Sequence, residues 1–97
     1  MNKAQVLSLL NQHRTEILQR FSVKHLAVFG SAARDEMRTG SDVDVLVEFD
    51  GASSFARYFE LKDYLERLFG RRVDLVTEKG LKPRARRHVE EDLIRVA

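Results

Sequence analysis

The link between two apolar segments, residues 24–29 and 42–49, restricts the folds open to this chain more than any other feature. Both segments have the apolar composition of buried strands, and glycine or polar residues bound them. A crossover between parallel strands needs a dozen or more residues and usually includes a packed helix. Residues 30–41 have room only for a short helix, from Ser31 to about Met37, and a loop. The two strands are therefore predicted to pair antiparallel within a mixed sheet.

Apolar residues at helical spacing predict helices on both sides of these strands. A first helix is expected from Lys3 to Arg20. Another follows the break at residues 50–53, with Ser53 or Ser54 as its N-cap and Gly70 at its end. The residues expected to face inward are Val6, Leu9, Leu10, His13 and Ile17 in the first helix, and Phe55, Tyr58, Leu61, Leu65, Leu68 and Phe69 in the other.

A third strand and a last helix complete the pattern. Residues 73–76 form a short apolar segment, and Pro83 suits the first turn of a helix. The inward face of this last helix is expected to contain Ala85, Val89, Leu93 and Val96. The order α-β-α-β-α-β-α predicts an α/β (α+β) fold, a small mixed sheet flanked by helices. A length of 97 residues suits one domain covering residues 1–97.

The residue types that are missing narrow the class of protein. The chain has no cysteine, so disulfides and thiolate metal sites are excluded and any metal is expected to be a hard ion bound by oxygen. No apolar run approaches the roughly 20 residues of a membrane-spanning helix. The first ten residues lack the pattern of a signal peptide. A cytoplasmic protein that makes no membrane contact is expected.

Basic residues gather in one run although the net charge is small. Lysine and arginine number 17 against 15 acidic residues, a formal charge of +2. The run contains Lys79, Lys82, Arg84, Arg86 and Arg87, with no acid between them. It could bind an acidic partner or RNA, or it could be the solvated face of a helix. The solvated face is favoured, because most charge runs in proteins are of that kind.

Two aspartates, Asp42 and Asp44, lie at the start of the second strand. Side chains alternate faces along a strand, so both carboxylates point the same way, with Cα atoms roughly 6.5 Å apart. Two carboxylates at ~4 Å repel each other by about 4 kcal/mol at an effective dielectric of 20. A divalent cation such as Mg²⁺, Mn²⁺ or Ca²⁺ would remove that repulsion. The alternative is that Asp42 is a turn residue and Asp44 is solvent-exposed at a sheet margin.

Gly30 and Ser31 favour the functional interpretation of the aspartates. A strand followed by Gly-Ser and a helix start presents unpaired backbone N–H groups to an anion. Gly30 would let the chain approach a phosphate closely, and Ser31 would add a hydroxyl donor. Arg34, one turn onward, would add positive charge or pair with a neighbouring acid. A phosphate site would then adjoin a metal site.

These residues resemble the signature of a known superfamily. The segment Gly30-Ser31-Ala32-Ala33-Arg34, followed by Ser41-Asp42-Val43-Asp44, is similar to the motif of polymerase-beta-type nucleotidyltransferases. In particular it resembles the minimal nucleotidyltransferase (MNT) proteins, small cytoplasmic antitoxins that act beside HEPN-domain toxins. The resemblance includes Asp74 in the later strand. One departure is Asp35, because the family often has glycine after the arginine.

The resemblance implies a role for each of these residues. Asp42 and Asp44 would hold two Mg²⁺ ions, and Asp74 would be the third ligand and possible base. Gly30 and Ser31, with Arg34, would hold the donor nucleotide, ATP or another NTP. The expected reaction moves a nucleoside monophosphate, AMP from ATP, to a tyrosine hydroxyl of a HEPN toxin. That activity is a transferase of the protein adenylyltransferase type, in a hetero-oligomer with the toxin.

Other interpretations stay open from the sequence. Asp74 could be a strand-margin acid balancing Arg71 or Arg72. The protein could neutralise its partner by binding alone, or it could act on RNA or a small molecule with the basic run as guide.

Several further residues carry weaker expectations. The arginines of the basic run, or Ile94, could contact the partner protein. His13 is expected to be a hydrogen-bonded core residue, Tyr58 could reach the nucleotide base, and Glu48 lies too far along its strand to share the metal.

Overall fold

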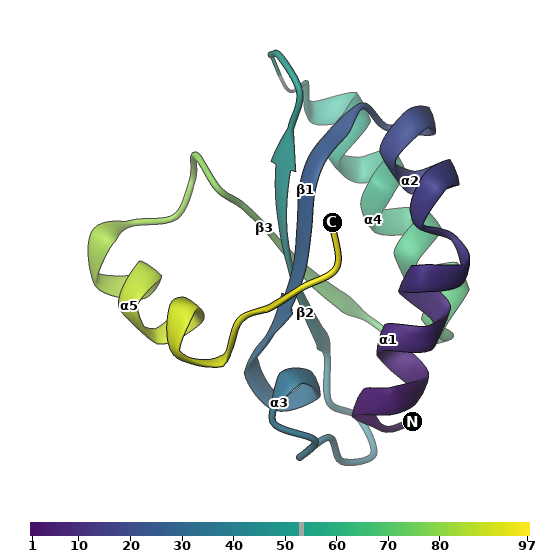
Figure 1. Ribbon diagram of the computed structural model, residues 1–97, viewed down its shortest axis with the longest axis vertical. Coiled ribbons are helices and arrows are strands. Elements are labelled where there is room, and N and C mark those ends of the chain that lie inside the picture. The colour runs from purple at the N-terminus through teal and green to yellow at the C-terminus, as the bar shows by residue number, and fades with distance from the viewer. Residues whose placement is uncertain (53) are drawn as a thin grey trace.

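The structure, a computed structural model, describes residues 1–52 and 54–97 (Figure 1). Helices and strands alternate along most of the chain. Their bounds are α1 Lys3–Gln12, α2 Arg14–Arg20, β1 Val23–Phe29, α3 Gly30–Ala33, β2 Val43–Phe49, α4 Phe55–Phe69, β3 Val73–Thr77, α5 Pro83–Asp92 and β4 Ile94–Arg95. None of the helices in these described ranges is long and apolar enough to cross a membrane.

The sheet has the strand order β3-β2-β1-β4. β1 pairs antiparallel with β2 and with β4, whereas β2 pairs parallel with β3. The predicted antiparallel pairing of the first two strands in a mixed sheet is therefore confirmed. The parallel pair is connected through α4, a helix of 15 residues that is long enough for a crossover.

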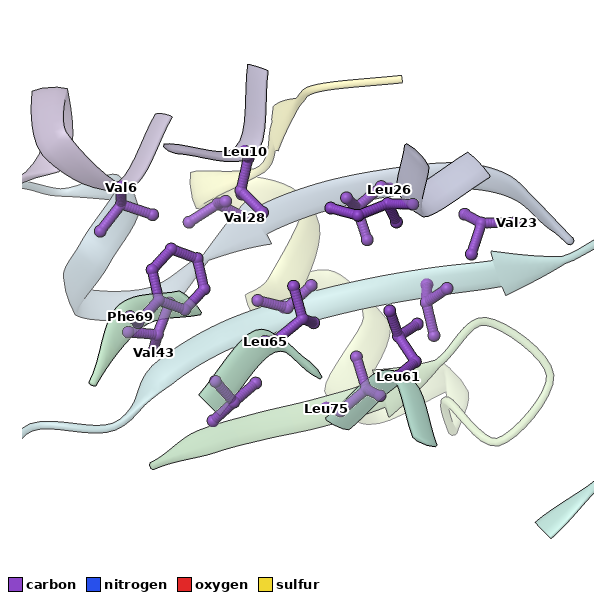
Figure 2. Close-up of a cluster of buried hydrophobic side chains, with 14 of the residues drawn as sticks. Val6, Leu10, Val23, Leu26, Val28, Val43, Leu61, Leu65, Phe69 and Leu75 are labelled. Carbon is purple, nitrogen blue, oxygen red and sulfur yellow. The ribbon is translucent and has the colours of Figure 1, made fainter. Parts of the chain in front are cut away.

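Helices cover the sheet unequally on its two faces (Figure 1). α1, α2 and α4 lie on one face, and α5 lies on the other. The main core forms under α1, α2 and α4, where Leu10, Leu61 and Leu65 belong to one cluster with side chains of β1, β2 and β3 (Figure 2). A smaller cluster under α5 joins Ala27, Leu46 and Val89. The two faces differ because alternate residues of each strand point to opposite sides.

The first predicted helix is divided in two at His13. This residue has φ −105° and ψ 10°, which ends α1 and precedes α2. Its Nδ1 atom lies 3.2 Å from the Tyr64 hydroxyl, so the prediction of a partly buried, hydrogen-bonded histidine is confirmed. The prediction of one continuous helix was wrong, because the backbone of His13 leaves the helical conformation between α1 and α2, although Ile17 stays in the core.

The prediction for α4 was right in its core and wrong at its first residue. Leu61, Leu65 and Phe69 are buried, but the Phe55 side chain is 85% exposed because it precedes the turn that reaches the sheet. Ser54 is the N-cap, accepting a hydrogen bond from the Arg57 N–H. The alternative cap, Ser53, lies outside the described residues.

The last helix ends earlier than predicted. α5 stops at Asp92, and the next residues pair with β1 as β4, so the element order gains a strand. Of the predicted inward residues, Val89 is buried and Ala85 and Leu93 are exposed. Ile94 is partly buried and packs against the main core, and its contact with a partner stays a prediction. Edge pairing prevailed because β1 still had unpaired backbone groups on that side.

The turn after α3 explains how this chain accommodates Asp35. The helix ends at Ala33, earlier than the predicted Met37, and Asp35 then adopts the left-handed φ of 59° that favours glycine. Its carboxylate compensates by accepting a hydrogen bond of 2.9 Å from the Lys3 N–H, in the first turn of α1. An aspartate at this position therefore links the two helices.

Substitutions at Asp35 should separate two contributions to the free energy of unfolding: the strain of the left-handed φ and the hydrogen bond from the Lys3 N–H. Asp35→Ala is expected to lower the free energy of unfolding by about 1 to 2 kcal/mol. The alanine keeps the strained left-handed φ and loses the hydrogen bond from the Lys3 N–H at the start of α1. Asp35→Gly should be nearly neutral, because relief of strain offsets the lost bond. Chemical denaturation of both variants measures this difference, and equal losses would show that the hydrogen bond alone matters.

Candidate active site

The parallel pairing of β2 and β3 brings Asp44 and Asp74 side by side. The two residues are direct partners in the register of these strands. Both point to the α5 face, because their neighbours Val43, Val45 and Val73 face the main core. Two predicted site residues that are 30 positions apart in the sequence thus share one place on the sheet.

The environment of Asp44 perturbs the protonation of its carboxylate. The pKa of Asp44 is raised to about 6, first because the group is partly buried and then because Asp74 and Asp42 are nearby negative charges. The alternative that Asp44 is a freely solvated margin residue does not agree with this environment. Such clustering of like charge is typical of functional sites.

Asp42 lies at the entrance of the site and faces outward. Its Oδ1 atom is 3.5 Å from Nε of Arg72, and both side chains are well exposed, so the ion pair is weak. In the part of the chain that the structure describes, neither Arg71 nor Arg72 forms an ion pair with Asp74. The expectation that Asp74 balances one of these arginines is therefore not supported.

Gly30 makes room for the Asp44 carboxylate. Phe29 pairs with Asp44 in the β1–β2 register, which places Gly30 directly beside the aspartate. A Cβ atom on Gly30 would lie 2.1 Å from Asp44 Oδ2, and the backbone has the left-handed φ of 66°. Glycine is required here for both reasons. The Gly-Ser motif and the Asp-x-Asp motif are thus in direct contact.

Ser31 and Arg34 belong to the short helix that starts at Gly30. Ser31 is half-buried in its first turn. Arg34 follows its last residue and donates hydrogen bonds to Asp92 at 2.7 Å and to Glu36 at 3.2 Å. Of the two roles expected for Arg34, pairing with neighbouring acids is the one the structure shows. The Asp92 pair also connects α3 to the end of α5.

A hollow of about 260 Å³ opens between α3 and α5, next to Gly30. Residues of β1, α3 and α5 line it: Phe29, Gly30, Arg34, His88, Val89, Glu91 and Asp92. Sequence reasoning did not identify His88, Glu91 or Asp92 as site residues. Their only local signal was their position on a charged helix, and the packing of α5 across the sheet brings them to the hollow beside Gly30.

Residues outside this cluster have other partners. The Tyr58 hydroxyl donates to the Leu75 carbonyl at the outer edge of β3, so it is already engaged. Glu48 lies near the far end of β2, 3.9 Å from His25, which agrees with its exclusion from the metal site. Arg86, in the basic run, pairs with Glu78 and Glu90.

The donor set fits a hard divalent cation. Asp44 and Asp74 lie side by side, Asp42 is near enough to raise the pKa of Asp44, and there is no sulfur and no histidine among the predicted ligands. Within residues 1–52 and 54–97, no three carboxylate or histidine side chains are already gathered closely enough to hold a metal. Asp42 accounts for this, because its carboxylate faces Arg72. Exchange of that exposed ion pair for a cation would complete the set.

Comparison with known proteins places this geometry in context. Residues 10–96 match the family described as the nucleotidyltransferase domain. A candidate protein adenylyltransferase of Methanocaldococcus jannaschii is 41% identical over 96 residues, covering 96% of each chain. The protein adenylyltransferase MntA of Thermococcus cleftensis is 45% identical over 78 residues, covering 80% of this chain and 79% of that one.

Solved structures with the same fold include a candidate minimal nucleotidyltransferase. It is 40% identical, has a TM-score of 0.75, and covers 91% of this chain and 93% of its own. A toxin–antitoxin structure with AMP-PNP has a TM-score of 0.75 at 18% identity, covering 90% of this chain and 72% of its own. A Shewanella oneidensis complex of tri-AMPylated HEPN toxin with MNT antitoxin has a TM-score of 0.69 at 17% identity, covering 94% and 71%. The last two similarities show a shared fold.

Proposed function

Because this chain belongs to the nucleotidyltransferase domain family and is a nucleotidyltransferase, we propose that it transfers AMP from ATP to a tyrosine hydroxyl of a HEPN toxin. The observation that carries this proposal is the contact between Gly30 and the Asp44 carboxylate, with Asp74 beside it. A nucleotide phosphate seated at the Gly-Ser turn would lie next to the carboxylates. Phosphoryl chemistry needs that adjacency.

Asp42, Asp44 and Asp74 are the residues that would hold Mg²⁺. When bound, a pair of such ions neutralises the phosphates and stabilises the attacking and leaving oxygens of an in-line displacement. Asp44 and Asp74 are held in place by the β2–β3 register, and Asp44 is also held against Gly30. The partial burial of Asp44 strengthens its interaction with any cation that reaches it.

The remaining steps use groups of this chain. The backbone of Gly30 and the hydroxyl of Ser31 would bind phosphate oxygens. The acceptor oxygen forms a bond to the α-phosphorus, and the bond to the bridging oxygen breaks, so that pyrophosphate leaves. Asp74, exposed at the margin of the cluster, would take the proton from the acceptor hydroxyl.

A partner protein supplies what this small domain lacks. Asp42 and Asp74 are exposed, and the hollow beside Gly30 is too small to enclose both nucleotide and acceptor. The relative from Thermococcus cleftensis is named a protein adenylyltransferase, which supports a protein as acceptor. The Shewanella oneidensis structure of an AMPylated HEPN toxin with its MNT antitoxin supports a HEPN protein as that acceptor and a hetero-oligomer as the assembly.

Position-specific labelling tests the proposal. The purified chain is mixed with Mg²⁺, a HEPN toxin encoded beside it, and ATP labelled on either the α- or the γ-phosphate. We expect label from the α-position on the toxin and none from the γ-position, because AMP is retained and pyrophosphate leaves. Replacement of the acceptor tyrosine by phenylalanine should remove the label. Transfer from the γ-position would identify a kinase instead.

The other functions considered receive less support. Binding without catalysis would not explain a cluster of repelling carboxylates or the similarity to transferases. RNA guidance by the basic run is weakened because Arg86 is engaged by two glutamates. In the same assay, an RNA acceptor would compete with the toxin for label.

A further inference from the structure

Resting on this proposed function, we infer that the hollow between α3 and α5 binds the nucleoside of the donor nucleotide, with the His88 ring against the base. Nothing in the local sequence around His88 marks it for this role. The inference names a subsite of the proposed active site and a residue that sets its affinity for the nucleotide.

The position of the hollow, beside the turn that would bind the phosphates, is the first support for this inference. Gly30 is both the residue that touches Asp44 and part of the wall of the hollow. A triphosphate held at this turn and beside the carboxylates would therefore place its nucleoside within reach of the hollow. The volume of about 260 Å³ is just below the range for drug-sized ligands, which suits a nucleoside better than a whole nucleotide.

The negative charge of the walls is the second support, because it favours a nucleoside over a phosphate group. Glu91 and Asp92 are acidic, and the one arginine, Arg34, is already paired with Asp92 at 2.7 Å. An unneutralised phosphate group would be repelled from these walls. A neutral nucleoside would not be repelled. The exposed Glu91 carboxylate could accept a hydrogen bond from a ribose hydroxyl or an exocyclic amine of the base.

The aromatic and apolar side chains of the walls are the third support, because they suit a flat base. Phe29, Val89 and His88 all line the hollow: Phe29 is half-buried, Val89 is buried, and His88 is exposed on α5. A flat base can enter such a hollow and present its face to the imidazole. Stacking of this kind tolerates different bases, because each has a π-face.

Binding measurements separate the nucleoside from the phosphates. Calorimetry with Mg²⁺ would compare ATP with inorganic tripolyphosphate, which lacks the nucleoside. For His88→Ala we expect ATP affinity to fall about five- to tenfold, the lower range for loss of one stacking contact. Tripolyphosphate affinity should not change. His88→Phe should restore ATP binding, because it restores a ring.

Arg87→Ala is the matched control. Arg87 is the neighbouring exposed residue on α5 and is not part of the wall, so both ligands should bind this variant with similar small losses. Unchanged ATP affinity in His88→Ala would overturn the inference and leave the proposed function standing. Loss of toxin labelling in His88→Ala with normal ATP affinity would assign the hollow to the acceptor tyrosine instead. If the unaltered chain bound neither ligand, both proposals would fail.

Discussion

Replacement of Asp42 and Asp44 together by alanine is expected to reduce transfer of α-label to the toxin by at least about 10³-fold. The reason is that these carboxylates supply most of the cation binding, and about 4 kcal/mol of lost transition-state stabilisation corresponds to that factor. Mn²⁺ binding measured on the same protein should be lost in parallel. Asp50→Asn, which removes an exposed carboxylate just beyond β2, is the control and should retain activity. Transfer that survives in the double variant would exclude metal-assisted catalysis at this site.

Loss of activity in an aspartate variant should come without loss of stability. The pKa of Asp44, about 6 in the folded protein, lies above its ordinary value of 3.8. The folded state therefore binds more protons than the unfolded state between these pH values, so the free energy of unfolding decreases as pH rises through that window. Above pH 6 the ionised carboxylate costs about 1 to 2 kcal/mol, allowing for solvent screening of a half-exposed group.

Asp44→Asn tests the predicted decrease of the free energy of unfolding with rising pH, in protein freed of metal by EDTA. The variant should be more stable than the unaltered chain at pH 7, and the difference should shrink toward pH 4.5. Urea unfolding at the two pH values measures it. A variant that is less stable at pH 7 would show that Asp44 makes favourable contacts in place of repulsive ones.

Gly30→Ala is expected to impair both folding and catalysis. The new Cβ would need the space of Asp44 Oδ2, and the residue would keep a strained φ of 66°. Strain and overpacking together should lower the free energy of unfolding by about 2 to 4 kcal/mol. The Asp44 carboxylate would have to rotate away, and a misplacement of that size costs on the order of 10²-fold in rate.

Gly70→Ala isolates the effect of backbone strain. Gly70 has a nearly identical φ of 68°, but a Cβ there would meet no atom within 4 Å. This control should lose about 1 kcal/mol of stability and leave transfer unchanged. Urea unfolding and label transfer, measured on both variants, give the comparison. If the two substitutions changed stability and label transfer equally, the contact between Gly30 and Asp44 would not matter for activity.

Local patterns were enough to predict much of the fold. The short link at residues 30–41 predicted the antiparallel pair, and helical spacing predicted the buried residues of α4 from Leu61 to Phe69. Errors occurred where local preference competed with the rest of the chain. The break at His13 and the end of α5 at Asp92 depend on how these segments meet the sheet. Phe55 has helical spacing but lies beyond the edge of the core.

The division between sequence and tertiary structure is clearest at the candidate site. The strand period alone predicted that Asp42 and Asp44 face the same way, since side chains alternate with a fixed period of two, whereas in the structure Asp42 precedes β2 and its carboxylate lies beside Arg72. The Gly-Ser turn was also readable, because glycine and serine have local conformational preferences. Only the tertiary structure decided that Asp74 lies opposite Asp44, that Gly30 contacts it, and that His88 lines a hollow beside them. Those relations depend on strand register and helix packing between segments distant in the sequence, and no local pattern encodes them.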